Sequence, residues 1–179
     1  TSTSDMCVVM ASGMAENETI GSLKTAAGSK LARAMLDVCE DLAYQMAADG
    51  EGATKVIEVN VKGADSAKDA HLVARAVAVS PLVKSAIHGS DPNWGRIVQS
   101  IGATTAVYEP GKVTVKIGSV TIFSGGQPNR RVDRNKLKSA VSASSVAIHI
   151  ALGAGEFADR VVTCDLSPEY VRFNSAYTT

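Results

Sequence analysis

The chain has 179 residues, of which 45 % are hydrophobic, so it is long enough to bury a core and fold as one domain. Eighteen basic residues balance eighteen acidic ones and only 4 % are aromatic, which argues against a nucleic-acid surface, an anionic-membrane surface and a base-stacking platform. Cys7, Cys39 and Cys164 are widely spaced, so we expect neither a disulfide framework nor a zinc site, and a reducing compartment fits.

The first fifty residues predict a strand, a loop and a long helix. Residues 6–10 form a short apolar run typical of a buried strand. Residues 15–28 are small, polar and glycine-containing, as in a loop. From Ser29 to near Asp49 a helix is predicted, because apolar residues recur at three- and four-residue spacing: Leu31, Met35, Val38, Cys39, Leu42 and Met46.

The middle of the chain predicts a strand followed by two helices. Residues 56–62 alternate between β-branched and polar side chains, which predicts a half-buried strand. Ser66 can cap a helix over Lys68–Val79. Ser80-Pro81 ends that helix or restarts it as a third helical piece over Pro81–Ile87.

The remainder alternates helices with strands. Asp91-Pro92 predicts the start of a helix that runs to Gly102, and Asp133 can cap a short helix over Arg134–Val141. A hairpin turn is predicted at Gly118-Ser119. The predicted strands are Val113–Ile117, Val120–Phe123, Val146–Leu152 and Arg160–Leu166. Residues 124–129 read as a loop, and Ser167-Pro168 predicts a brief C-terminal helix ending near Asn174.

This order of elements defines the expected fold class. We find no internal repeat and no linker, so we expect a single domain over 1–179. Helices and strands are mixed and some strands form hairpins, which favours an α+β or layered α/β arrangement over a doubly wound sheet.

The stretch from His88 to Arg96 concentrates the only tryptophan with a proline, two glycines, an acid and a base. It is a candidate site of chemistry, because Gly and Pro fix the backbone while Asp, Asn and Arg make directional hydrogen bonds. It can equally be a structural knot. In that reading Arg96 and Asn93 bond loop carbonyls, Trp94 fills a gap and Pro92 starts a helix.

Glu51 lies between two glycines at the junction of a predicted helix and a predicted strand. Flanking glycines let a backbone approach a ligand closely, and the carboxylate could bind an ammonium group or transfer a proton. The same residues fit a tight turn with a solvated acid. The three histidines are isolated in sequence, and no pair has the spacing of metal ligands.

Both ends of the chain allow two interpretations. Thr1 could be a nucleophile that uses its own amine as base, or simply the place where a longer product was cut, since the start resembles no signal peptide and lacks Met. Residues 174–179 could be a frayed tail, or could fold over a site and offer an amide, hydroxyls and a carboxylate.

Four segments in this order resemble one family: Thr1–Asp5, Asp49–Lys55, Gly89–Arg96 and Asp165–Tyr177. Together they resemble the β-subunit of ornithine acetyltransferase, the bifunctional glutamate N-acetyltransferase of arginine biosynthesis, and the resemblance spans residues 1–179. It implies a layered α/β fold similar to that of N-terminal nucleophile enzymes, but with different connectivity.

In that family a precursor cuts itself before a threonine in an Ala-Thr-Met-Leu setting. The new terminal threonine takes acetyl from N-acetylornithine and passes it to glutamate in a ping-pong reaction. This sequence contains no Ala-Thr-Met-Leu, so we expect no catalytic residue in this chain. The nucleophile is expected upstream of Thr1, and the oxyanion hole on the α-subunit.

The resemblance implies that Glu51, Asn174 and Thr179 bind substrate. It implies no cofactor, although acetyl-CoA is a possible substrate. The implied partners are the α-subunit and the missing start of β, in a heterotetramer of two α and two β located in the cytoplasm or an organelle matrix. The alternatives are an acyltransferase with another donor or acceptor, a noncatalytic interaction subunit, and an aminopeptidase that uses Thr1.

Overall fold

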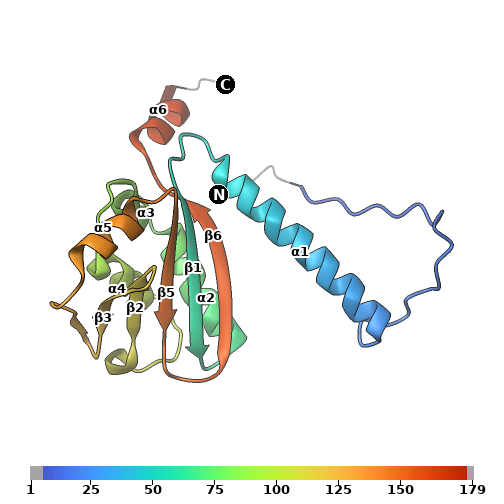
Figure 1. Ribbon diagram of the computed structural model, residues 1–179, viewed down its shortest axis with the longest axis horizontal. Helices are drawn as coiled ribbons and strands as arrows, with labels where there is room; N and C mark the ends of the chain where they lie inside the picture. The colour runs from blue at the N-terminus through green and yellow to red at the C-terminus, as the bar shows by residue number, and fades with distance from the viewer. Residues whose placement is uncertain (1–5, 177–179) are drawn as a thin grey trace. The chain divides into compact units, whose positions relative to one another are not determined.

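The computed structural model describes residues 6–176. Its contacts divide the chain into two units, with the boundary in the sequence between Ala43 and Tyr44. The first unit holds an extended segment and most of helix α1 (Ala26–Ala48), as Figure 1 shows. The second unit holds every strand that is described.

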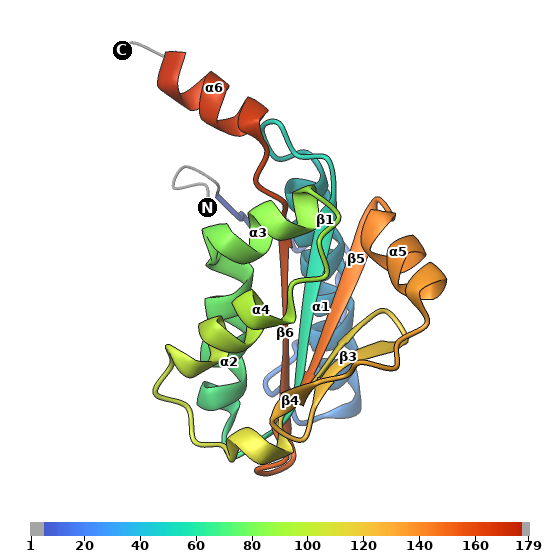
Figure 2. The same ribbon diagram turned by 90° about the vertical axis from the view of Figure 1, so that its left-hand side faces the viewer.

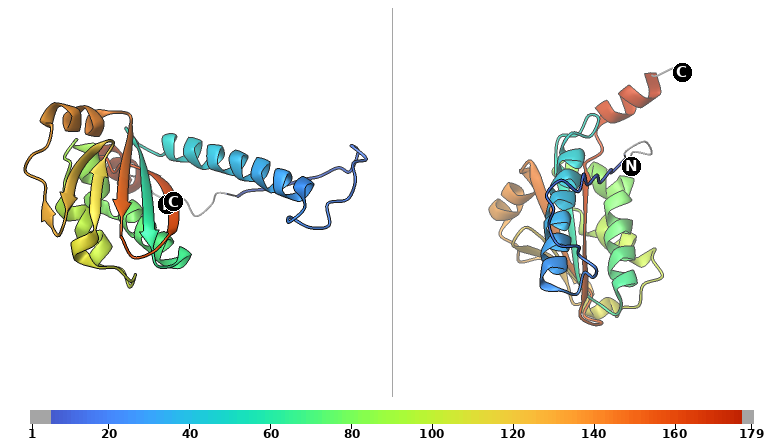
Figure 3. Two further views of the ribbon diagram at one scale, coloured as in Figure 1. Left: turned by 60° about the horizontal axis from the view of Figure 1, so that its bottom comes forward. Right: turned by 90° about the vertical axis from the view of Figure 1, so that its right-hand side faces the viewer.

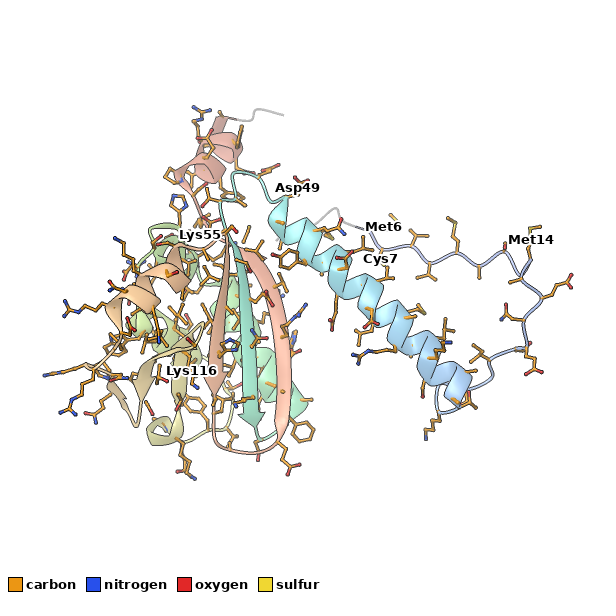
Figure 4. All side chains as sticks on the ribbon, viewed as in Figure 1. Met6, Cys7, Met14, Asp49, Lys55 and Lys116 are labelled. Atoms are coloured by element: carbon orange, nitrogen blue, oxygen red, sulfur yellow. The ribbon has the colours of Figure 1, made fainter. Side chains whose placement is uncertain are left out.

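The predicted strand at residues 6–10 is wrong. These residues have no regular structure and every one of them is exposed; Met6 and Met10, for example, are 84 % and 89 % exposed. A β-strand needs a neighbour to accept and donate its backbone hydrogen bonds. Within the described residues no strand pairs with this segment, so its side chains project from an extended chain (Figure 4).

The predicted long helix is confirmed, but it begins before Ser29. Thr25 sets the start, because its hydroxyl accepts a hydrogen bond from the N–H of Gly28 at 3.1 Å, as an N-cap residue does. The apolar stripe expected on this helix is present but exposed in the described structure, between 41 % and 58 % at Leu31, Met35, Val38, Leu42 and Met46.

The second unit is built on a six-stranded mixed sheet with strand order β4-β3-β2-β5-β1-β6. Strands β1 (Val56–Ala64) and β5 (Ser145–Ala151) run parallel, and every other neighbouring pair runs antiparallel. The other strands are β2 (Thr114–Ile117), β3 (Val120–Ser124), β4 (Gln127–Pro128) and β6 (Phe157–Cys164). The mixed α/β class is confirmed, as is the hairpin turn at Gly118-Ser119; β4 lies where a loop was predicted.

The core lies on one face of this sheet. In register, Ile57, Val59 and Val61 of β1 lie beside Val146, Ile148 and Ile150 of β5, and all six are buried. Helix α2 (Ala67–Val79) packs on β1 and β6, and α4 (Trp94–Gly102) packs on α2. Figure 2 and the right-hand view of Figure 3 show these helices on the same side of the sheet. Each fully buried valine or isoleucine contributes about 1.5–3 kcal/mol.

Caps define the remaining helices. Ser66 and Asp133 cap α2 and α5 (Arg134–Ser142) as predicted, and α3 (Pro81–His88) starts at proline. The helix predicted to start at Pro92 starts at Trp94 instead, because the Asn93 side chain accepts the N–H of Arg96 at 3.1 Å. The other helical elements are η1 (Pro110–Lys112) and α6 (Pro168–Ala176).

No single helix among residues 6–176 combines the length and apolar character needed to cross a membrane. Helices α2 and α3 meet that test only as a pair, and they are bent by 56° at their junction.

Candidate functional site

The segment from Gly50 to Lys55 connects α1 to β1 and lies against the segment that connects β6 to α6. Gly52 shows how close the approach is. Its φ is +65°, and a Cβ at this position would lie 2.7 Å from the backbone N of Tyr170. Only glycine fits such a backbone without strain and without displacing a neighbour.

Two of the predicted substrate-binding residues meet at this place. The Asn174 amide donates to Oε2 of Glu51 at 3.0 Å, although the two residues are 123 positions apart in sequence. The same amide nitrogen donates to the carbonyl of Tyr170 at 3.0 Å, which fixes its orientation on α6. Both side chains are exposed and can therefore reach a ligand. The third predicted residue, Thr179, and the candidate nucleophile Thr1 lie outside the described residues.

A buried carboxylate holds the other end of the loop that carries Glu51. The Asp165 side chain is fully buried and accepts hydrogen bonds from the backbone N–H groups of Thr54 and Lys55, at 2.8 and 3.0 Å. Its second oxygen accepts from the Thr54 hydroxyl at 2.5 Å and lies 2.7 Å from Nδ1 of His88. The sequence offered no sign of this role, because the partners are far from Asp165 along the chain.

The charge on Asp165 is stabilised by these partners. Burial alone would raise the pKa of this carboxyl group, but the hydrogen bonds from Thr54, His88 and Lys55 outweigh burial and hold the pKa below its usual value. The group is therefore ionised at neutral pH, and it fixes the His88 tautomer with the proton on Nδ1.

Thr54, His88 and Asp165 include the residue types of a nucleophilic triad, but their geometry is different. The Thr54 hydroxyl and the Asp165 carboxylate both lie near the same ring nitrogen, Nδ1, at 3.2 and 2.7 Å. A triad needs the nucleophile and the acid on opposite ring nitrogens, so that the ring can take a proton from one side while it is oriented from the other. This cluster therefore holds the backbone in place and does not activate Thr54.

Lys55 connects the same loop to three other elements. Its ammonium donates to the carbonyls of Ile87 and Val141 and to the hydroxyl of Ser90, at 2.8, 2.9 and 2.6 Å. Burial lowers the pKa of Lys55, and the nearby charge of Asp165 partly opposes that effect. In Figure 4 the residue lies at the beginning of β1. Its three hydrogen bonds join that point to α3, to the His88–Arg96 stretch and to α5.

The His88–Arg96 stretch has a structural role, with three corrections to the expected contacts. Arg96 donates to a carbonyl at 2.8 Å, but the acceptor is Leu82 in helix α3 and not the predicted loop carbonyl. Asn93 bonds no loop carbonyl, because its oxygen caps α4 and its nitrogen donates to the Asp91 carboxylate. Trp94 does not fill an interior gap: it stacks on Phe123 with ring centroids 5.3 Å apart and remains 38 % exposed.

Ser167 does more than the predicted helix cap. Its hydroxyl accepts the N–H of Tyr170 at 3.1 Å, as a cap should, and also donates to the carbonyl of Gly52 at 2.6 Å. The start of α6 is thereby joined to the loop of residues 50–55, which carries Glu51.

Two hollows in the described structure lie away from Glu51 and Asn174. One of about 520 Å³ is lined by Ser124 and the residues of 127–131. Another of about 400 Å³ lies on the polar sheet face around Lys62, Lys116 and His149. Neither hollow includes Glu51 or Asn174, whose side chains are exposed on the surface.

The fold and the site define an α/β protein that presents a carboxylate and an amide together, with a buried carboxylate holding the other end of the loop that carries Glu51. A carboxylate can accept hydrogen bonds from an ammonium group, and an amide N–H can donate to a carboxylate. The chain belongs to the ArgJ family, which it matches over residues 1–179.

Named relatives agree with this assignment. The chain is 41 % identical to the arginine biosynthesis bifunctional protein ArgJ of Bacillus cereus, and 41 % identical to the protein of the same name from Thermobifida fusca. All of this chain is matched, but it covers only 43 % and 44 % of those two proteins. The crystal structure of arginine biosynthesis bifunctional protein argJ from Bacillus halodurans superposes with a TM-score of 0.91 at 40 % identity, over 99 % of this chain and 83 % of the solved chain.

Proposed function

We propose that this chain is part of an acetyltransferase that moves the acetyl group from N-acetylornithine to glutamate, giving ornithine and N-acetylglutamate. Family membership and relatives named for arginine biosynthesis support the pathway. The observation that carries the proposal is the contact between Glu51 and Asn174, because it brings together two residues, 123 positions apart, that the family resemblance implies as substrate-binding.

Each side chain has a chemical part in this proposal. The exposed Glu51 carboxylate binds the ammonium group of ornithine or the amino group of glutamate. The Asn174 amide offers N–H donors to a substrate carboxylate. The hydrogen bond between the two side chains holds each of them in place. Thr179, the third residue that the family resemblance implies, lies outside the described residues and would add a hydroxyl to this site.

The rest of the reaction belongs to other parts of the enzyme. We place the nucleophilic threonine upstream of Thr1 and the oxyanion hole on an α-subunit, formed when one precursor cuts itself. The lengths of the relatives support this division: the solved chain is about half as long as the Bacillus cereus protein, because this chain covers 83 % of the former and 43 % of the latter. The threonine is acetylated and deacetylated in two half-reactions.

The assembly we propose has two α and two β subunits and acts in the cytoplasm, or in an organelle matrix in a eukaryote. The reaction as proposed needs no cofactor, because the acyl group stays on threonine between the half-reactions. Acetyl-CoA would enter only as an alternative acetyl donor.

The test uses the complete enzyme that contains this chain, supplied with N-acetylornithine and glutamate. Replacing Glu51 by Gln should raise KM for both amino acids about tenfold or more, because a hydrogen bond to a charged group contributes roughly 1.5–3 kcal/mol. The matched control is Glu156→Gln. Glu156 is another exposed acid next to a glycine, but it precedes Phe157, which pairs with the far end of β1. An unchanged KM for Glu51→Gln would contradict the site, and absence of transfer by the wild type would contradict the function.

A further inference from the structure

The segment between β6 and α6, Asp165-Leu166-Ser167, forms hydrogen bonds at two points with the loop of residues 50–55, which carries Glu51. Asp165 holds the backbone N–H groups of Thr54 and Lys55, and Ser167 holds the carbonyl of Gly52. Both polar residues are only 3 % exposed. Buried polar side chains cost free energy unless they are bonded, so their bonds are a defined part of the structure.

Ser167 belongs to a closed ring of hydrogen bonds. Its hydroxyl joins Gly52 to the N–H of Tyr170. One turn of α6 further on, the carbonyl of Tyr170 accepts from the Asn174 amide, which also donates to Glu51. The ring closes through the peptide bond between Glu51 and Gly52. We therefore expect the buried Ser167 hydroxyl to fix the distance between the exposed side chains of Glu51 and Asn174.

Asp165 fixes the other end of the same loop. Its own N–H donates to the carbonyl of Lys55 at 3.0 Å, and its carboxylate accepts the N–H of that residue. Lys55 and Asp165 thus each donate a hydrogen bond to the other. Residues 51–55 therefore cannot shift along β6 without breaking several hydrogen bonds.

We propose that Ser167 and Asp165 are positioning residues for substrate binding, which hold Glu51 and Asn174 at the spacing that receives an amino acid. The inference rests on the proposed function of that pair. A group that only holds the binding pair affects binding in the ground and transition states alike, so its loss raises KM and leaves kcat nearly unchanged.

The test is a double-mutant cycle in the complete enzyme, with Ser167→Ala, Asn174→Ala and the two combined. Ser167→Ala should raise KM for glutamate about fivefold, because one lost hydrogen bond is worth about 1 kcal/mol. Combined with Asn174→Ala it should add little further, because Ser167 acts by setting the spacing between Glu51 and Asn174, and that spacing no longer matters once the amide is removed. Additive effects on KM would overturn the proposal.

Ser66→Ala is the matched control, since Ser66 caps α2 through the same kind of bond, from the N–H of Asp69 at 3.1 Å. It should lower the thermal midpoint as a cap loss does and leave KM unchanged. If Ser167→Ala lowers the midpoint but not KM, its role is structural only and the proposal fails.

Asp165→Asn provides a second variant that keeps the shape of the side chain. It should raise KM for glutamate, whereas Asp133→Asn, at the exposed cap of α5, should not. Normal KM in Asp165→Asn would remove Asp165 from the proposal. If Asn174→Ala itself leaves KM unchanged, the proposed substrate site fails and the positioning role fails with it. If only Asn174→Ala raises KM, the positioning role alone is wrong.

Discussion

Asp165 accepts two hydrogen bonds from Thr54, one from its backbone N–H and one from its hydroxyl. A single residue of the loop thus satisfies both oxygens of a fully buried carboxylate. These hydrogen bonds, with that from the N–H of Lys55, join the residues just before β1 to the residue just after β6.

Replacing Asp165 by Ala should lower the free energy of unfolding by about 3–5 kcal/mol, because two backbone N–H groups, a hydroxyl and an imidazole lose their acceptor in a buried place. Asp133→Ala, at an exposed cap, should cost only about 1 kcal/mol. Urea unfolding followed by circular dichroism compares them, and equal costs would contradict the importance of the buried cluster.

Stability should fall in acid through Asp165. The pKa of this carboxyl is lowered in the folded protein, so its contribution is fully present above the ordinary pKa of an unfolded aspartate and is lost as pH falls through the folded value. The loss should begin below about pH 5. Unfolding midpoints of wild type and Asp165→Asn between pH 3 and pH 7 should converge at the acid end; a constant difference would count against this assignment.

Gly52→Ala should both destabilise the protein and raise KM for glutamate, because the new Cβ would lie 2.7 Å from the backbone of Tyr170. Gly125 is a close control: its φ is +62°, compared with +65° at Gly52, and no atom lies within 4 Å of its Cβ position. Gly125→Ala should show only the backbone strain, roughly 1 kcal/mol, with normal KM. Similar behaviour of the two variants would mean that the close approach is unimportant.

Lys55→Met should cost about 1–3 kcal/mol, because the carbonyls of Ile87 and Val141 lose a charged donor. Lys55→Arg should not restore stability, since a planar guanidinium cannot reproduce three bonds around one nitrogen. Lys62→Met, at an exposed position of β1, is the neutral control. Chemical denaturation measures all three, and full rescue by arginine would contradict the geometry.

Trp94→Ala should cost about 2 kcal/mol, less than the roughly 3–5 kcal/mol expected for a fully buried tryptophan, because the ring is 38 % exposed and keeps one stacked partner. KM for glutamate should remain normal. A folded variant with normal stability but without substrate binding would return the His88–Arg96 stretch to the list of candidate sites.

Local patterns were sufficient wherever the deciding interactions lie within a few residues. Ser66 marks the start of α2 because a hydroxyl at that position can bond the N–H of Asp69, and Gly118-Ser119 marks a hairpin because its glycine adopts φ +55°. The ladder of β1 was readable from alternating side chains. The same logic failed at residues 6–10, because a strand exists only where a second strand pairs with it.

The sequence by itself determined the helices, most strands of the sheet, the mixed α/β class and the family resemblance that singled out Glu51 and Asn174. Only the tertiary structure decided that these two residues touch, and that Asp165 and Ser167 bond the loop that follows Glu51. The antiparallel register of β1 and β6 pairs Val56 with Cys164, so the residues just beyond, Lys55 and Asp165, meet. That proximity depends on pairing between segments more than a hundred residues apart, which no local pattern records.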